Sequence, residues 1–272
     1  QPLGHLTSGG TTANLEALWV ARQCHAKTVV LANEHAHYTH SRMSEVLGMP
    51  FQAVASTENG SMDLIALETM LKELRSEGVN ATVVATLGTT GMGAVDALED
   101  IVPLAHTYDA RIHVDAAYGG YFTLADLPFN TLRHFNAMSS ANSIVIDPHK
   151  HGLQPYGCGA VLFKNPEEGR FYKHDSPYTY FTSDQLHLGE ITLECSRAGA
   201  AAAALWATQQ KFPYERSGAF AKRLNASLEA AQGLKRSLIA KDWWVLEPEL
   251  DICVFSLPGV KASEISTLNR AF

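Results

Sequence analysis

Residues 111–120 read RIHVDAAYGG, in which a short apolar run stops at an acidic residue and gives way to small residues. The run Arg111–Asp115 has the length and the Ile and Val content of a buried β-strand. The stretch SIVIDPHKHG at residues 143–152 repeats this arrangement, with a second apolar strand, Ser143–Asp147, that ends close to Lys150. Polar residues directly after buried strands are typical of α/β sheets, which bind ligands outside the carboxyl ends of their strands.

Strand and helix patterns alternate on both sides of these two motifs. The other expected strands are Thr28–Ala32, Phe51–Ala55, Ala81–Thr86 and Gly159–Phe163, and the expected helices are Thr11–Ala26, Thr39–Leu47, Leu64–Glu77 and Leu98–Tyr108. Asp63 is placed to cap the third of these helices. The alternation predicts an α/β fold with a mainly parallel sheet that helices cover on both faces.

The pattern changes after Lys164. A Tyr- and Phe-rich polar stretch at 170–188 is expected to form a loop, and helices and strands are expected at Ser196–Phe212, Tyr214–Ile239, Trp243–Leu246, Ile252–Ser256 and from Ala262 onward. We therefore predict a large domain over 1–200 and the start of a smaller α+β domain over 201–272. Because the chain begins at Gln1 and stops within a helical pattern, we expect it to be a fragment of a longer protein.

The composition excludes several classes of protein. The chain has 272 residues, of which 46% are hydrophobic, and its 21 Lys and Arg against 28 Asp and Glu give a net charge of −7. An acidic chain without a basic block argues against binding to nucleic acid or an anionic membrane. The longest run of apolar and small residues, Ala198–Ala207, is too short to span a bilayer. Four scattered cysteines argue against a disulfide framework and favour a reduced cytoplasmic compartment.

Two strand ends carry candidate catalytic residues. Lys150 lies beside imidazoles and within reach of the core, where an amine loses its proton more easily and becomes available for Schiff-base chemistry. The alternative is a solvated loop lysine. Asp115 ends its strand where a carboxylate can hold a ring nitrogen protonated, and the small Ala116 and Ala117 leave room for a flat ring. The alternative is an aspartate that caps the next turn.

Two further motifs precede these. The stretch TSGGTTAN at residues 7–14 leads into a helix, and its hydroxyls and N–H groups suit an anion such as a phosphate, although such a start also serves as a simple cap.

His35, His37 and His40 have a spacing that is typical of a metal site, but no cysteine or carboxylate cluster accompanies them, so we predict no metal. An imidazole stacked on a flat cofactor or ordinary loop histidines are the alternatives. The order of phosphate cup, aromatic stacker, carboxylate and lysine predicts pyridoxal 5′-phosphate.

As a set, these motifs resemble the group II pyridoxal-phosphate-dependent amino-acid decarboxylases, which include aromatic-amino-acid, tyrosine and glutamate decarboxylases. The resemblance runs from Gly4 to about residue 210 and rests on HVDAAYGG at 113–120, DPHK at 147–150, TLGTT at 86–90 and EHAHY at 34–38. It implies a fold-type-I large domain. The stretches at 155–159 and 196–200 are most similar to microbial tyrosine-decarboxylase-like members.

The resemblance also implies a role for each matching residue. Lys150 forms the internal Schiff base with the cofactor, Asp115 keeps the ring nitrogen protonated, and His37 and Ala117 pack on the two ring faces. The phosphate is held by Ser8, Gly9, Gly10 and Thr11 with help from His149, and Thr89 contacts the ring or the substrate. CO₂ leaves the substrate and a quinonoid forms, and Tyr178, or else Tyr180, then protonates Cα. The role of Arg197 stays open between binding an anion and joining the two domains.

The expected function is therefore decarboxylation of an L-amino acid, with an aromatic, tyrosine-like substrate as first candidate, by a homodimer. The alternatives are another reaction on the same cofactor, either aminotransfer or carbon–carbon lyase chemistry, and a non-catalytic module that has kept the fold. Family members have a segment before the phosphate cup and a complete small domain, and this chain is expected to lack both.

Overall fold

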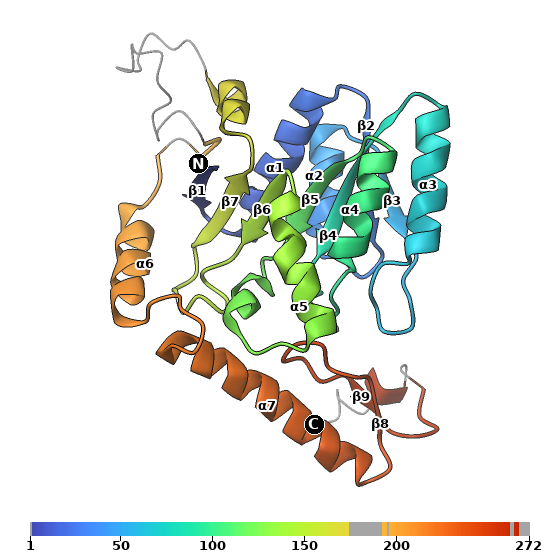
Figure 1. The fold of residues 1–272 in the computed structure, drawn as a ribbon, viewed down its shortest axis with the longest axis vertical. Helices are drawn as coiled ribbons and strands as arrows, with labels where there is room; N and C mark the ends of the chain where they lie inside the picture. Colours follow the sequence, from blue (N-terminus) through green and yellow to red (C-terminus); the bar gives the residue numbers. More distant parts are fainter. Residues whose placement is uncertain (1, 174–191, 195, 262–263, 267–272) are drawn as a thin grey trace.

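The computed structural model describes residues 2–173, 192–194, 196–261 and 264–266 (Figure 1). Its main feature is a sheet in the order β1-β7-β6-β5-β4-β2-β3. The strands are β1 (Leu3–Thr7), β2 (Thr28–Asn33), β3 (Phe51–Val54), β4 (Asn80–Thr86), β5 (Arg111–Asp115), β6 (Ser143–Ile146) and β7 (Gly159–Phe163). Within this sheet β7 is antiparallel to both its neighbours, and the pairs from β6 to β3 are parallel. The predicted α/β class with a mainly parallel sheet is confirmed.

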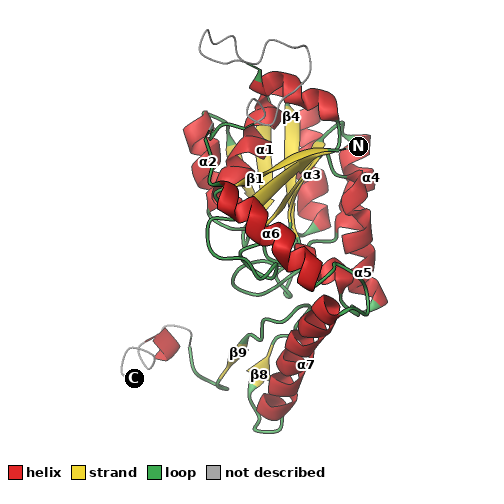
Figure 2. Cartoon of the chain, turned by 90° about the vertical axis from the view of Figure 1, so that its left-hand side faces the viewer, coloured by secondary structure: helices red, strands yellow, loops and turns green. Residues whose placement is uncertain are grey.

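Helices cover both faces of this sheet (Figure 2). α1 (Gly10–Cys24) and α2 (Thr39–Leu47) cover one face, and α3 (Leu64–Ser76), α4 (Leu98–Thr107) and α5 (Phe129–Asn136) cover the other. Two more helices, α6 (Gly199–Lys211) and α7 (Ala219–Ile239), follow later in the chain. Successive strand residues face opposite sides, so β2 places Val29 and Leu31 in one core with α3 and α4. Val30 and Ala32 pack in a second core with α1 and α2. A strand buried on both faces explains the continuous apolar run in its sequence.

The same alternation decides where the polar residues of β5 point. Ile112 and Val114 belong to the core beneath α3 and α4. His113 and Asp115 therefore face the α1 and α2 side, although both are buried. This places two ionisable groups from one strand against the two helices that carry the other polar motifs.

Most of the expected elements are present, with the bounds of two strands and one helix matched to the residue. The predicted cap is confirmed, because the Asp63 carboxylate accepts hydrogen bonds from the N–H groups of Ile65 and Ala66. Among the described strands and α-helices, β1 and α5 were not predicted. The β1 sequence LGHLT has no regular alternation, and its conformation comes from pairing with β7, where Leu3 lies opposite Phe163.

The C-terminal residues contain α7 and a two-stranded sheet of β8 (Trp244–Val245) and β9 (Phe255–Ser256), both shorter than predicted. Phe220 and Leu224 of α7 are buried in the large core. No residue of α6 is buried, and Trp206 is 65% exposed. The predicted boundary near residue 200 stays a prediction, and the loop expected at 170–188 lies mostly outside the described residues.

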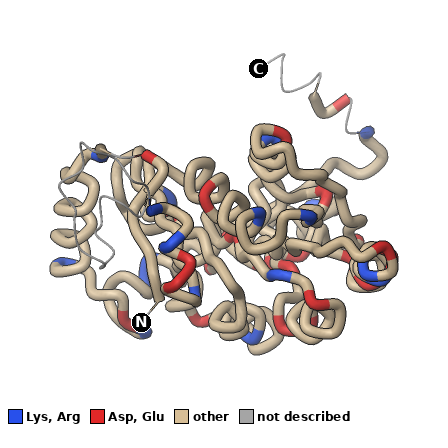
Figure 3. Tube along the Cα trace, turned by 90° about the horizontal axis from the view of Figure 1, so that it is seen from above, with Lys and Arg blue, Asp and Glu red and all other residues tan. Residues whose placement is uncertain are grey.

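Charged residues of both signs are interspersed along the described part of the chain (Figure 3). Within the same residues, none of the helices combines the length and the apolar character needed to cross a bilayer.

Candidate active site

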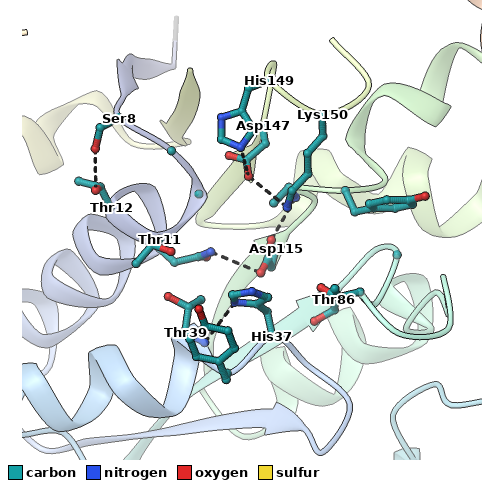
Figure 4. A pocket seen from close by; sticks show the side chains of 18 of the residues that line it. Ser8, Thr11, Thr12, His37, Thr39, Thr86, Asp115, Asp147, His149 and Lys150 are labelled. Atoms are coloured by element: carbon teal, nitrogen blue, oxygen red, sulfur yellow. Dashed lines mark hydrogen bonds and ion pairs between the residues drawn. The ribbon is translucent and has the colours of Figure 1, made fainter. Parts of the chain in front are cut away.

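A cavity of about 510 Å³ opens where the carboxyl ends of β4, β5 and β6 meet the start of α1 (Figure 4). Parallel strands bring their carboxyl ends to one edge, so motifs far apart in the sequence converge there. The predicted site residues that line the cavity are Ser8, Gly9, Gly10, Thr11, His37, Asp115, Ala117, His149 and Lys150. The structure therefore brings the start of α1, the histidine, the carboxylate and the lysine together around one cavity.

The lysine is carried by the turn that follows β6. Lys150 Nζ lies 3.1 Å from Asp147 Oδ2, and His149 Nε2 lies 3.5 Å from the same oxygen. Asp147 is buried, and this burial raises the pKa of its carboxyl, whereas the electrostatic influence of Lys150 and His149 acts in the opposite direction. His149 Nδ1 accepts a hydrogen bond from the Cys158 N–H, and this contact directs Nε2 toward Asp147.

The start of α1 lies close against the lysine turn. Gly9 has φ 152°, a conformation that favours glycine, and no side chain caps the helix. A Cβ on Gly10 would lie 2.5 Å from Asp147 Oδ2, so only glycine fits between the helix and the lysine turn. The Ser8 and Thr12 hydroxyls lie 3.0 Å apart, and the Ser8 N–H donates to Glu194. The uncapped N–H groups of the first turn carry the positive end of the helix dipole.

Asp115 is 4% exposed and is held from three sides. Its Oδ1 accepts from the Ala117 N–H at 3.0 Å, and its Oδ2 accepts from His40 Nε2 at 2.8 Å and from Asn14 Nδ2 at 3.4 Å. Burial favours the neutral acid, but the hydrogen bond and the charge of His40, together with the Ala117 N–H, hold the pKa of Asp115 well below its usual range. Asp115 is therefore a buried carboxylate.

His37 also lines the cavity and is drawn just below Asp115 in Figure 4. Its Nδ1 accepts a hydrogen bond from the Thr39 N–H at 3.2 Å, at the start of α2. Burial lowers the pKa of His37, and the positive charges of Lys150 and His40 act in the same direction against Asp115. The ring is thus a neutral imidazole of fixed orientation, which suits packing against a flat ligand.

Two predicted site residues are not part of this cavity as described. Thr89 is fully buried, and its Oγ1 accepts from the Ala94 N–H, while Thr86 and Thr90 of the same motif line the cavity. Tyr178 lies outside the described residues, as does Tyr180. Arg197, which carried no assigned role, donates to the Leu6 carbonyl of β1 at 2.6 Å.

Several polar residues of the site were not assigned from the sequence: Asn14, His40, Asp147 and Tyr118. Tyr118 lines the cavity, but its hydroxyl donates to Asp251 at 2.8 Å, and burial together with this carboxylate raises the pKa of the phenol. Its proton is therefore directed away from the cavity. Asp251 also lies 3.1 Å from the Nε2 of His151, so one carboxylate near the C-terminus joins two turns of the site.

The three histidines of the early motif have different surroundings. His37 lines the cavity, His40 bonds Asp115, and His35 is exposed. Among the described residues no group of three or more His, Cys, Asp or Glu side chains is arranged to hold a metal ion.

Comparison with known proteins gives consistent results. Residues 12–257 match the family model described as the pyridoxal-dependent decarboxylase conserved domain. The chain is 33% identical over 264 residues to a probable L-aspartate decarboxylase of Halobacterium salinarum, covering 96% of this chain and 69% of that protein. It is 28% identical over 272 residues to a probable L-tyrosine/L-aspartate decarboxylase of Methanothermobacter thermautotrophicus, covering 97% of this chain and 70% of the relative.

Solved structures show the same fold. A structure of Oryza sativa TDC with PLP and tryptamine superposes with a TM-score of 0.87 at 17% identity, over 99% of this chain and 60% of that one. Mouse CSAD in apo form gives a TM-score of 0.83 at 22% identity, over 97% of this chain and 59% of that one. The chain thus spans about three fifths of the solved structures that it matches.

Proposed function

Because this chain belongs to the pyridoxal-dependent decarboxylase family, we propose that the intact protein removes the α-carboxylate of an L-amino acid and releases CO₂ and the amine. The observation that carries the proposal is the convergence of Lys150, Asp115, His37 and the start of α1 on one cavity of about 510 Å³. An aromatic, tyrosine-like amino acid is the first substrate to test. Aspartate is the second, because both amino acids occur in the names of relatives.

The residues of the cavity fit pyridoxal 5′-phosphate. The uncapped first turn of α1 supplies N–H donors for its phosphate, and Gly9 and Gly10 leave the space that a Cβ would fill. The buried carboxylate of Asp115 matches a protonated ring nitrogen, and Lys150 supplies the amine for a covalent link. When bound, the cofactor supplies an electron sink for the pair left by the departing carboxylate.

The chain's own residues then hold charge and protons in place. Asp115, kept ionised by its donors, stabilises a positive charge at the ring nitrogen. His37, neutral and fixed by the Thr39 N–H, covers one side of the ligand while Ala117 leaves space on the other. Asp147 Oδ2 holds the Lys150 amine at 3.1 Å and so orients it toward the cavity. The same oxygen lies 3.5 Å from His149 Nε2, so Asp147 keeps a polar partner when the amine of Lys150 is engaged by the ligand.

Three further parts of the proposal concern the intact protein. Tyr178 is the proposed donor of the proton to Cα, supported by the family resemblance of its segment and by the direction of the Tyr118 hydroxyl away from the cavity. A homodimer is proposed by the same resemblance, with sedimentation velocity as its test. A cytoplasmic location is proposed from the cysteines, of which Cys24, Cys158 and Cys253 are free thiols in the described chain.

Borohydride trapping tests the proposed site. After incubation with pyridoxal 5′-phosphate and reduction, peptide mapping should find the adduct on Lys150, and a Lys150→Ala variant should lose it. Lys164→Ala is the matched control, because Lys164 is an exposed lysine just after β7. A folded protein without an adduct would contradict the proposal.

Product analysis then tests the reaction. The intact protein is incubated with tyrosine, phenylalanine, tryptophan, aspartate, glutamate and 2,4-diaminobutyrate, and the amine products and CO₂ are measured by mass. Amine and CO₂ in equal amounts support decarboxylation. Consumption of substrate that depends on an added keto acid, without CO₂, would instead identify an aminotransferase.

A further inference from the structure

A cluster of hydrogen-bonded, buried polar side chains lies behind the cavity, on the side of the sheet that α1 and α2 cover. It contains His40 of α2, Asp115 and His113 of β5, Asn14 of α1 and Ser143 of β6. All five residues are buried, with His40 and His113 at 0% exposure. Of these, Asp115 and Asn14 also line the cavity, so the cluster extends from the proposed cofactor site into the protein.

His40 has a single side-chain hydrogen bond among the described residues, to Asp115. The distance from His40 Nε2 to Asp115 Oδ2 is 2.8 Å, and His40 Nδ1 has no hydrogen-bond partner among the residues that the structure describes. A carboxylate only accepts, so the proton lies on His40 Nε2. Burying a polar ring costs free energy unless it is hydrogen-bonded, and the bond to Asp115 is the one that offsets this cost for His40.

The other members of the cluster orient a second donor to Asp115, the side-chain amide of Asn14. His113 is a neutral ring, because burial lowers its pKa to about 3. Its Nε2 lies 2.7 Å from Asn14 Oδ1 and its Nδ1 lies 2.9 Å from Ser143 Oγ. With Asn14 Oδ1 accepting from His113, the Asn14 amide directs Nδ2 at Asp115 Oδ2, but at 3.4 Å this contact is longer than that of His40.

We propose that His40 is a positioning residue for the reaction: it donates to Asp115 Oδ2 and so keeps this carboxylate ionised and turned toward the ring nitrogen of the bound cofactor. The inference rests on the proposed function, and it concerns a residue that does not line the cavity. Without this donor, Asp115 keeps only the Ala117 N–H and the long Asn14 contact against the cost of burying a charge. The carboxyl then takes up a proton, and a neutral acid no longer stabilises a protonated ring nitrogen.

The test uses the intact protein loaded with pyridoxal 5′-phosphate that carries ¹⁵N in its ring. The ¹⁵N chemical shift reports the proton on the ring nitrogen without any turnover. In His40→Leu we expect the shift to move toward that of unprotonated pyridine, and kcat to fall about tenfold or more with KM within about twofold. In His40→Gln the side-chain amide replaces Nε2 as donor, so the shift should stay near the wild-type value.

Two further variants complete the design. His35→Leu is the matched control, since His35 belongs to the same motif but is exposed, and it should leave the shift unchanged. If His40→Leu does not fold, His40→Asn replaces it, because its shorter amide does not reach Asp115. The proposal is wrong if the donor-free variant keeps the wild-type shift and kcat, or if the glutamine variant is affected equally. A wild-type protein that forms no adduct at Lys150 would instead refute the proposed function.

Discussion

Replacement of Gly10 by alanine tests how closely α1 approaches the lysine turn. The added Cβ would lie 2.5 Å from Asp147 Oδ2, 2.9 Å from Oδ1 and 3.0 Å from Cγ. Asp147 has little freedom to withdraw, because it is buried and its Oδ2 is held by Lys150 at 3.1 Å and lies near His149. The helix is also fixed at its first turn, where the Ala13 N–H donates to the Gly9 carbonyl.

The expected cost follows from this overlap. Forcing one extra methyl group into a filled site costs about 1–3 kcal/mol. Alanine is the better helix former by up to about 1 kcal/mol, and this gain is smaller at the first helical residue than in the interior. We therefore expect a net loss of about 1–2 kcal/mol in the free energy of unfolding. For a protein of this size, that loss lowers the thermal midpoint by roughly 2–8 °C.

The assay is thermal unfolding of the cofactor-free protein, followed by titration with pyridoxal 5′-phosphate. Gly91→Ala is the matched control, because Gly91 is exposed and its Cβ would meet nothing within 4 Å. The control should keep the wild-type midpoint, whereas Gly10→Ala should lower it and weaken cofactor binding. A Gly10→Ala protein as stable as the wild type, with unchanged cofactor affinity, would refute the close approach of α1 to Asp147.

Three other predictions concern groups around the site. Glu168→Gln removes the negative charge and one of the two acceptors of a buried bidentate pair with Arg111 (Nη1 to Oε1 2.8 Å, Nη2 to Oε2 2.7 Å) and leaves the guanidinium uncompensated, so urea unfolding should show a loss of about 3–5 kcal/mol, most of which Arg111→Met combined with Glu168→Leu restores. Asp251→Ala removes the acceptor of the Tyr118 hydroxyl at 2.8 Å and the partner of His151 Nε2 at 3.1 Å, so we expect a loss of about 1–3 kcal/mol and faster cofactor loss on dialysis; full cofactor retention would show that these two contacts do not support the site. Burial lowers the pKa of His113 to about 3, so the unfolded chain binds a proton below about pH 6.5 that the folded protein does not. Stability present above pH 6.5 should thus be lost toward pH 3 by up to about 1.4 kcal/mol per pH unit, and a His113→Gln variant with the same pH slope would contradict this.

The sequence by itself determined the class of fold and the strand ends and helix start that meet at the cavity. Arg111–Asp115 is a buried strand in the sequence and in the structure, and Lys150 follows the next strand. Parallel strands end at one edge of the sheet, so a residue that follows a strand can be assigned to that edge from local pattern alone. Gly9 and Gly10 were assigned to the site by a second local pattern, because glycines at the start of a helix can be recognised from the sequence alone.

The orientation of side chains within turns was not available from the sequence. The TLGTT motif was identified, but Thr89 points to the Ala94 N–H while Thr86 lines the cavity. The turn depends on Gly88 at φ 100° and on an isolated bridge between Leu87 and Val95, which fix the direction of each threonine. A motif match assigns a segment to a site, whereas the backbone angles decide which of its side chains reach the ligand.

Only the tertiary structure decided which residues support the site from behind. His40 reaches Asp115 across 75 positions of the sequence, and Asp251 reaches Tyr118 across 133. No periodicity relates such pairs, because each contact depends on how a helix or a C-terminal loop packs against the sheet. Local pattern reports the environment of a residue along its own strand or helix, and the partner of a buried charge is chosen by packing between elements.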